Sequence, residues 1–176
     1  MAIKIVLDAG HGGWDNGASF ENRREKEDNL QLTLEVGRIL EEMGFEVVYT
    51  RTGDVYQAPF KKATIANEEG ADLFVSIHRN SSAVVNQYQG VETLIYSEGG
   101  LPEQVAENIN EQLEQVGYSN LGIEERPNLI VLNSTQMPAV LVEVGFLNSK
   151  TDNDLFDQRF EETAYAIAEG IKEGIS

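Results

Sequence analysis

The stretch IKIVLDAGHGG, residues 3–13, decides the fold that we expect for this chain. Its apolar and β-branched residues run directly into Asp8, and small residues then surround His11. This pattern is typical of a buried parallel strand that ends at the edge of a sheet, where glycines leave the backbone open. Ligands of open α/β sheets bind beyond the carboxyl ends of the strands, so we expect His11 to point into a cleft.

The only other histidine of the chain has an equivalent position. His78 ends a second apolar run, ADLFVSIH at residues 71–78, and the polar residues RNSS follow it. Parallel strands of one sheet present their carboxyl ends on the same edge, so we expect His11 and His78 to share a site. For either histidine alone, a loop residue without a chemical role is an equally good interpretation.

Length and composition limit the classes of protein to which the chain can belong. Its 176 residues most simply form one domain, residues 1–176. Because cysteine is absent, any metal ligands must be His, Asp or Glu. The net charge of −17 argues against binding to nucleic acid or anionic membranes. No apolar stretch approaches the ~20 residues of a membrane span, and we expect neither membrane insertion nor a signal peptide in this chain.

Predicted strands and helices alternate along the chain. After the first strand and a long polar loop at residues 12–26, further strands are expected at residues 45–50, 71–78, 89–97, 128–132 and 139–144. Helices are expected at residues 27–43, 57–69, 102–116 and 155–175. The alternating pattern at residues 89–97 indicates an edge strand. The pattern as a whole predicts a single α/β domain with a twisted, mainly parallel sheet of about six strands flanked by helices.

Carboxylates complete a candidate metal site. Glu143 lies inside the apolar run MPAVLVEVGFLN at residues 137–148, where a carboxylate is costly unless it is paired with a cation or faces a polar site. Two histidines and one carboxylate form a common catalytic zinc set, with a second carboxylate to handle protons. The spacing does not choose the third ligand among the acidic residues near the first strand: Asp8, Asp15, Glu21, Glu25, Glu27 and Asp28.

Several spaced motifs resemble one enzyme family. In chain order they are LDAGHGG followed by NGA, EKEDNL, TRTGD, IANEEGADLFVSIHRNS and VLNSTQMPAVLVEVGFLNS. Together they resemble the zinc-dependent N-acetylmuramoyl-L-alanine amidases, the bacterial and phage enzymes that cut stem peptides from peptidoglycan. The resemblance implies one Zn²⁺ per chain, with His11, Glu25 and His78 as ligands and Glu143 as the catalytic carboxylate.

The resemblance also implies a substrate, a reaction and a setting. The enzyme would use a zinc-activated water and Glu143 as general base and acid to cut the amide between N-acetylmuramic acid and L-alanine. We expect a monomeric catalytic domain that acts in the cell wall. It would be exported within a longer protein that carries a wall-binding domain, or released by a phage.

The chain departs from the family pattern at three positions. Arg79 replaces a small residue, Leu121 replaces a frequent arginine, and Lys62 replaces another arginine. We expect the first two to alter the substrate groove and none of the three to contact the metal set. Some members of the family carry an inserted helix that plugs the zinc, but residues 90–127 hold no spare segment for one. The sequence therefore predicts an open cleft and activity without an activating partner.

Other interpretations remain open at this point. A non-catalytic cell-wall-binding module with a structural zinc would need four protein ligands, and only three are identified. A zinc carboxypeptidase acting on stem peptides usually has His-x-x-Glu, but Trp14 stands three residues after His11. A nucleotide-binding loop at DAGHGG lacks the G-x-G-x-x-G spacing, and its charge is unfavourable.

Overall fold

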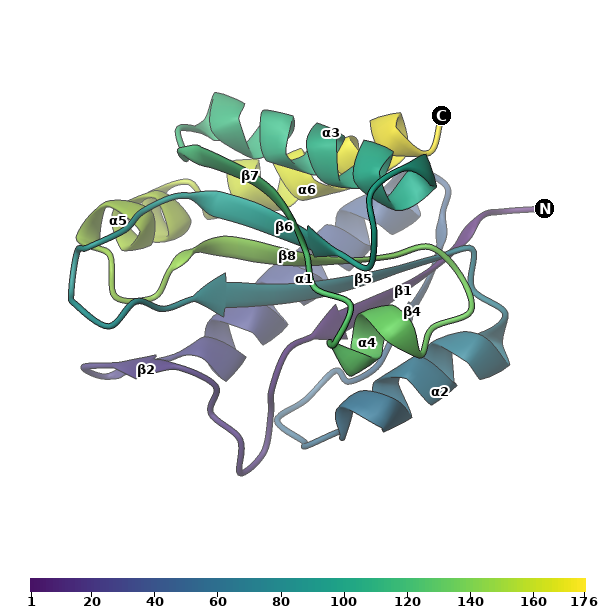
Figure 1. Ribbon diagram of the computed structural model, residues 1–176, viewed down its shortest axis with the longest axis horizontal. Coiled ribbons are helices and arrows are strands. Elements are labelled where there is room, and N and C mark those ends of the chain that lie inside the picture. The colour runs from purple at the N-terminus through teal and green to yellow at the C-terminus, as the bar shows by residue number, and fades with distance from the viewer.

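A six-stranded sheet runs through the middle of the protein, with helices on both faces (Figure 1). The computed structural model describes residues 1–176. The strands of this sheet are β1 (Lys4–Ala9), β4 (Glu46–Tyr49), β5 (Leu73–Asn80), β6 (Val91–Ile95), β7 (Asn120–Glu125) and β8 (Ala139–Phe146). The helices are α1 (Glu25–Glu42), α2 (Pro59–Glu69), α3 (Gly100–Val116), α4 (Ile130–Asn133), α5 (Lys150–Gln158) and α6 (Phe160–Gly174). A separate hairpin consists of β2 (Ser19–Phe20) and β3 (Arg23–Arg24).

The strand order is β4-β1-β5-β8-β6-β7, and most neighbours are parallel. Strands β4, β1, β5 and β8 run in one direction, whereas β6 is antiparallel to β8 and β7 is parallel to β6. The predicted single α/β domain with a mainly parallel sheet is therefore confirmed. The carboxyl ends of β1 and β5 lie side by side, and both chain termini lie toward the opposite end of the sheet (Figure 1).

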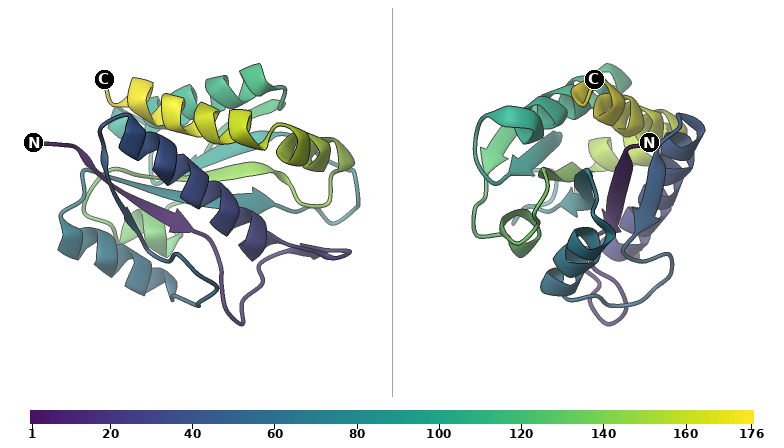
Figure 2. Two further views of the ribbon diagram at one scale, coloured as in Figure 1. Left: turned by 180° about the vertical axis from the view of Figure 1, so that it is seen from behind. Right: turned by 90° about the vertical axis from the view of Figure 1, so that its right-hand side faces the viewer.

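The two faces of the sheet are covered unequally. Helices α1, α3 and α6 pack on one face around the larger apolar core, and the shorter α2 and α4 cover the other (Figure 2). Side chains alternate along β5, so Val75 and Ile77 belong to the larger core while Phe74 faces α2 and α4. By the same alternation Ser76 and His78 lie on the side of α2 and α4, where less chain covers the sheet. The helices of the structure are not long and apolar enough to span a membrane.

Three expectations for residues 89–132 are wrong. Residues 128–132 do not form a strand, because Val131 and Leu132 lie in the short helix α4 and pack into the smaller core. The short apolar run NLIVL carries no period that distinguishes a strand from a helical turn. We expected no strand at residues 120–125, where the structure has β7, because these mostly exposed and weakly apolar residues give no strand signal. Because β7 pairs with β6, the β6 strand is internal and not at the edge.

All four predicted helices have different bounds from those expected: α2 begins at Pro59 instead of residue 57, and α3 begins at Gly100 instead of residue 102. The predicted helix 155–175 is divided at Arg159 into α5 and α6. The predicted loop 12–26 contains the β2–β3 hairpin, and α1 begins at Glu25 instead of Glu27. The earlier start places Glu25 in the first helical turn, where the helix dipole stabilises a carboxylate.

Candidate active site

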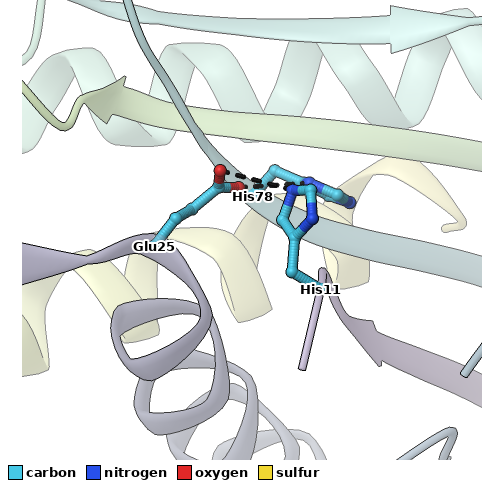
Figure 3. A group of neighbouring side chains, drawn as sticks. All are labelled: His11, Glu25 and His78. Carbon is cyan, nitrogen blue, oxygen red and sulfur yellow. Dashed lines mark ion pairs between the residues drawn. The ribbon is translucent and has the colours of Figure 1, made fainter. Parts of the chain in front are cut away.

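His11, Glu25 and His78 converge at the carboxyl edge of the parallel strands (Figure 3). Oε1 of Glu25 lies 3.3 Å from Nε2 of His11, and its Oε2 lies 3.2 Å from Nδ1 of His78. One histidine follows β1, the other lies near the end of β5, and the glutamate comes from the start of α1. The structure thus brings together both histidines of the chain and one of the six acidic candidates.

Glu25 is buried and held by several donors. Its carboxylate accepts hydrogen bonds from the backbone N–H groups of Ala18 and Arg79, at 3.0 and 3.1 Å, and from the Asn29 amide at 3.0 Å. Burial alone would raise the pKa of Glu25, but the two histidines lower it well below its usual range. Glu25 is therefore an ionised carboxylate in a fixed position.

His11 is oriented by a second carboxylate. Oδ2 of Asp15 lies 2.8 Å from Nδ1 of His11, so this nitrogen can donate to Asp15 while Nε2 faces Glu25. Burial would lower the pKa of His11, but Glu25 and Asp15 outweigh it and raise the pKa to about 9. A Cβ at Gly10 would collide with the His78 ring, so glycine at this position leaves the room that the ring occupies.

The three side chains fit a zinc ion. One ligand atom from each of them lies within 4.8 Å of the others. Two imidazoles and one carboxylate are a ligand set of catalytic zinc sites, in which a further position stays open to substrate. The side chains of His11 and His78 retain 28% and 17% of their exposure, so the group is reached from solvent.

Glu143 lies beside this group without a cation partner. It is the β8 neighbour of His78 in the parallel register, at the usual strand spacing of about 4.8 Å. Its Oε2 is buried and accepts no hydrogen bond, and no Lys or Arg forms an ion pair with it. Burial raises the pKa of Glu143 to about 7, a value suited to a group that takes and returns a proton. The alternative of a structural, ion-paired glutamate is not supported.

A cleft of about 340 Å³ adjoins the two histidines. Tyr56, Leu129 and Ile130 contribute to its walls. Lys62 and Asp8 also line it, and they form a buried ion pair of 3.0 Å. The hydroxyls of Thr50 and Ser76 donate to Asp8 at 2.7 and 2.6 Å, completing a polar network that joins β1, β5 and α2. Lys62 thus performs a structural role beside the site, which its sequence position does not reveal.

The expectation that Arg79 alters the substrate groove is wrong, because its side chain has no exposed surface. The guanidinium donates to the carbonyl of Val144 at 2.9 Å, and to Asp28 and Asn153 at 3.0 and 2.7 Å. It also lies 4.4 Å from the ring centre of Phe156. The backbone N–H of Arg79 donates to Glu25, so this position does contact the candidate metal-binding group of His11, Glu25 and His78, contrary to expectation. Leu121 is exposed on β7.

The other five acidic candidates lie outside the group formed by His11, Glu25 and His78. Asp15 contacts His11, Asp8 pairs with Lys62, and Asp28 pairs with Arg79. Glu21 and Glu27 are exposed. Asn29 and the side-chain contacts of Arg79 were not anticipated. Of these residues, only Asn29 could have been found from the sequence. It lies four residues after Glu25 in the same helix, and this spacing places both side chains on one face of the helix.

Comparisons with known proteins agree with this site. The family described as N-acetylmuramoyl-L-alanine amidase matches residues 5–173. The sporulation-specific N-acetylmuramoyl-L-alanine amidase of Bacillus subtilis is 33% identical, over 99% of this chain and 69% of the relative. The endolysin of Bacillus phage SPP1 is 35% identical, over 98% of this chain and 66% of the relative.

A solved structure agrees as well. The catalytic domain of CwlV, an N-acetylmuramoyl-L-alanine amidase from Bacillus (Paenibacillus) polymyxa, superimposes with a TM-score of 0.89 at 35% identity and covers 98% of both chains. The family match spans nearly the whole chain, and the same fold recurs in this solved amidase. The chain belongs to the N-acetylmuramoyl-L-alanine amidase family.

Proposed function

We propose that this chain is a zinc-dependent hydrolase of the amide between the lactyl group of N-acetylmuramic acid and L-alanine. The observation that carries the proposal is the convergence of His11, Glu25 and His78 beside the unpaired carboxyl of Glu143. Zinc held by the first three would polarise the scissile carbonyl and lower the pKa of the attacking water.

The chain's own residues supply the proton transfers. Glu143 has a free carboxylate oxygen and a pKa near neutrality, so it accepts the proton of the attacking water. The protonated carboxyl then donates to the nitrogen of L-alanine, which leaves as an amine. Asp15 and Asn29 hold His11 and Glu25 in place throughout this sequence.

Digestion of purified peptidoglycan tests this assignment. We expect new L-alanine amino termini without new reducing sugar ends. Glu143→Gln keeps the side-chain shape but removes the base, so zinc should remain bound while turnover falls by at least about 10²-fold. Glu111→Gln, on the exposed face of α3, serves as the matched control and should be as active as the unmodified protein. Release of carboxyl-terminal amino acids in place of whole stem peptides would identify a carboxypeptidase instead.

We also propose that residues 1–176 act as a monomeric catalytic domain on peptidoglycan outside the cytoplasm. The two relatives above are longer than this chain, which spans 69% and 66% of their lengths. We propose in addition a longer parent protein with a wall-binding domain, for which the unmatched part of the two relatives leaves room. Light scattering on the zinc-loaded protein should give the mass of one chain, 19.5 kDa.

A further inference from the structure

Two exposed aromatic side chains lie beside the metal-binding group. Trp14 is 77% exposed and Tyr56 is 40% exposed. Their ring centres are 4.6 Å apart, with an angle of 34° between the planes. Tyr56 also lines the cleft that contains His11 and His78, so the pair extends the cleft outward. Two large rings facing water at this place offer an apolar surface for a ligand to cover.

We propose that Trp14 and Tyr56 form a platform that binds a sugar ring of the glycan strand while its stem peptide is cut. This inference rests on the proposed function and adds the side of the cleft on which the glycan lies. A pyranose ring has an apolar C–H face that matches an aromatic surface, and its polar groups stay at the rim. Tyr56 links this platform to the catalytic cleft.

The platform is rigid because its two loops are joined at several points. The backbone N–H of Gly13 donates to Asp54 at 2.8 Å. The amine of Lys26 donates both to the Gly13 carbonyl, at 2.8 Å, and to Asp54, at 3.0 Å. Gly12 has φ +133°, and a Cβ there would collide with the carbonyl oxygen of Val55. The backbone that carries Trp14 and Tyr56 is therefore fixed by contacts between the two loops before a ligand arrives, which reduces the entropy cost of binding.

Charge favours the glycan over the stem peptide as the occupant. The loops of the platform carry the carboxylates of Asp15 and Asp54. Their buried cation, Lys26, is already paired with Asp54, and Lys62 in the adjoining cleft is paired with Asp8. A stem peptide carries free carboxylates, and neither lysine is free to pair with them. The sugar rings of the glycan are uncharged, and their hydroxyl groups can donate to the acidic rim.

The fluorescence of Trp14 tests the platform directly, because it is the only tryptophan of the chain. Glycan oligomers of N-acetylglucosamine carry neither a stem peptide nor the free lactyl carboxylate of peptide-free N-acetylmuramic acid, so they are uncharged and can be added to the zinc-loaded protein without turnover. We expect them to shift the emission to shorter wavelength and to reduce quenching by acrylamide. Stem peptide alone should leave both unchanged. Protection of Trp14 by stem peptide, or no effect of the glycan, would overturn the proposal.

Substitutions at the platform give a second readout. Trp14→Ala and Tyr56→Ala should raise KM for muramyl peptides about threefold to tenfold, with kcat nearly unchanged, because the platform binds ground and transition states alike. Both side chains are exposed, so neither change should unfold the protein. Tyr165→Ala, at a tyrosine on α6 that is 53% exposed, is the control. A fall in kcat without a rise in KM would contradict a binding role.

Failure of the platform and failure of the proposed function are distinguishable. Glycan binding is measured without hydrolysis, whereas amidase activity is measured by new L-alanine termini. If those termini appear while glycan leaves Trp14 unprotected, the amidase assignment stands and the platform does not. If glycan protects Trp14 but no termini form, the platform stands and the reaction is a different one.

Discussion

Oδ2 of Asp15 lies 2.8 Å from Nδ1 of His11, so a carboxylate that is not itself in the metal-binding group orients one of its imidazoles. Oδ1 of the same side chain accepts the backbone N–H of Gly17 at 3.0 Å, which fixes the carboxylate in turn. Ligand histidines usually donate their second ring nitrogen to such a group, which sets the tautomer and the ring position.

We expect Asp15→Ala to lower the zinc affinity about 10- to 100-fold, because His11 loses the partner that orients it. Competition with a chromophoric chelator measures this affinity. Asp154→Ala, at a half-buried aspartate on α5 that pairs with Lys150, is the control and should not change it. Equal affinities in the two variants would show that Asp15 does not support the metal ligand.

The pKa of His11 predicts proton release on zinc binding. In the metal-free protein Glu25 and Asp15 raise this pKa to about 9, so the imidazole is protonated at pH 7. A protonated nitrogen cannot bind metal, so zinc must displace about one proton from His11. Affinity should therefore increase as the pH rises toward 9 and level off above it. Calorimetry at pH 7 in buffers of different ionisation enthalpy measures the proton, and identical heats would refute its release.

Replacement of Glu25 should distinguish it from its acidic neighbours. Glu25→Ala removes a proposed ligand and should abolish stoichiometric zinc binding, as measured by metal analysis after dialysis. Glu21→Ala, in the same polar segment but exposed, should retain about one zinc per chain. Retention of zinc by the Glu25 variant together with its loss from the Glu21 variant would reassign the third ligand.

The sequence was sufficient to predict the site residues that lie at the ends of strands. His11 and His78 end apolar runs, and the rule for parallel sheets alone places them together. Glu143 was identified from the sequence because a charged side chain inside an apolar strand is costly unless it is paired or faces a polar site. Glu25 could not be chosen among its neighbours without the family resemblance, because its place depends on where α1 begins and on the β2–β3 hairpin.

The partners of these residues depend on long-range contacts that local patterns do not contain. Lys62 meets Asp8 from 54 positions away, and the side chain of Arg79 reaches Asn153 across 74 positions. The β7 strand was missed for a related reason, since its pairing with β6 and not its own weakly apolar residues makes it a strand.

Arg79 should contribute strongly to stability. Arg79→Met leaves the Val144 carbonyl without its donor and the largely buried Asp28 with only Arg23 as a partner. Removal of one member of a buried ion pair costs about 3–5 kcal/mol, so the free energy of unfolding in urea should fall by that order. Arg38→Met, on the exposed face of α1, should change it by less than about 1 kcal/mol. Similar values for both variants would contradict the structural role of Arg79.

The last prediction is that the enzyme needs no activating protein. Residues 90–127, where a blocking helix could be inserted, are occupied by β6, α3 and β7. Val105, Ile109 and Leu113 of α3 are fully buried in the larger core, so this helix cannot cover the cleft without exposing them.

Purified protein with one equivalent of zinc should therefore release stem peptides from isolated sacculi unaided, whereas Glu143→Gln should not. The measurement is the appearance of L-alanine amino termini over time. Addition of an extract of the bacterial envelope should leave the initial rate within about twofold, since α3 is packed in the larger core and does not block the cleft. If release began only after a second protein was added, the cleft would have to be closed in solution by a rearrangement of the chain.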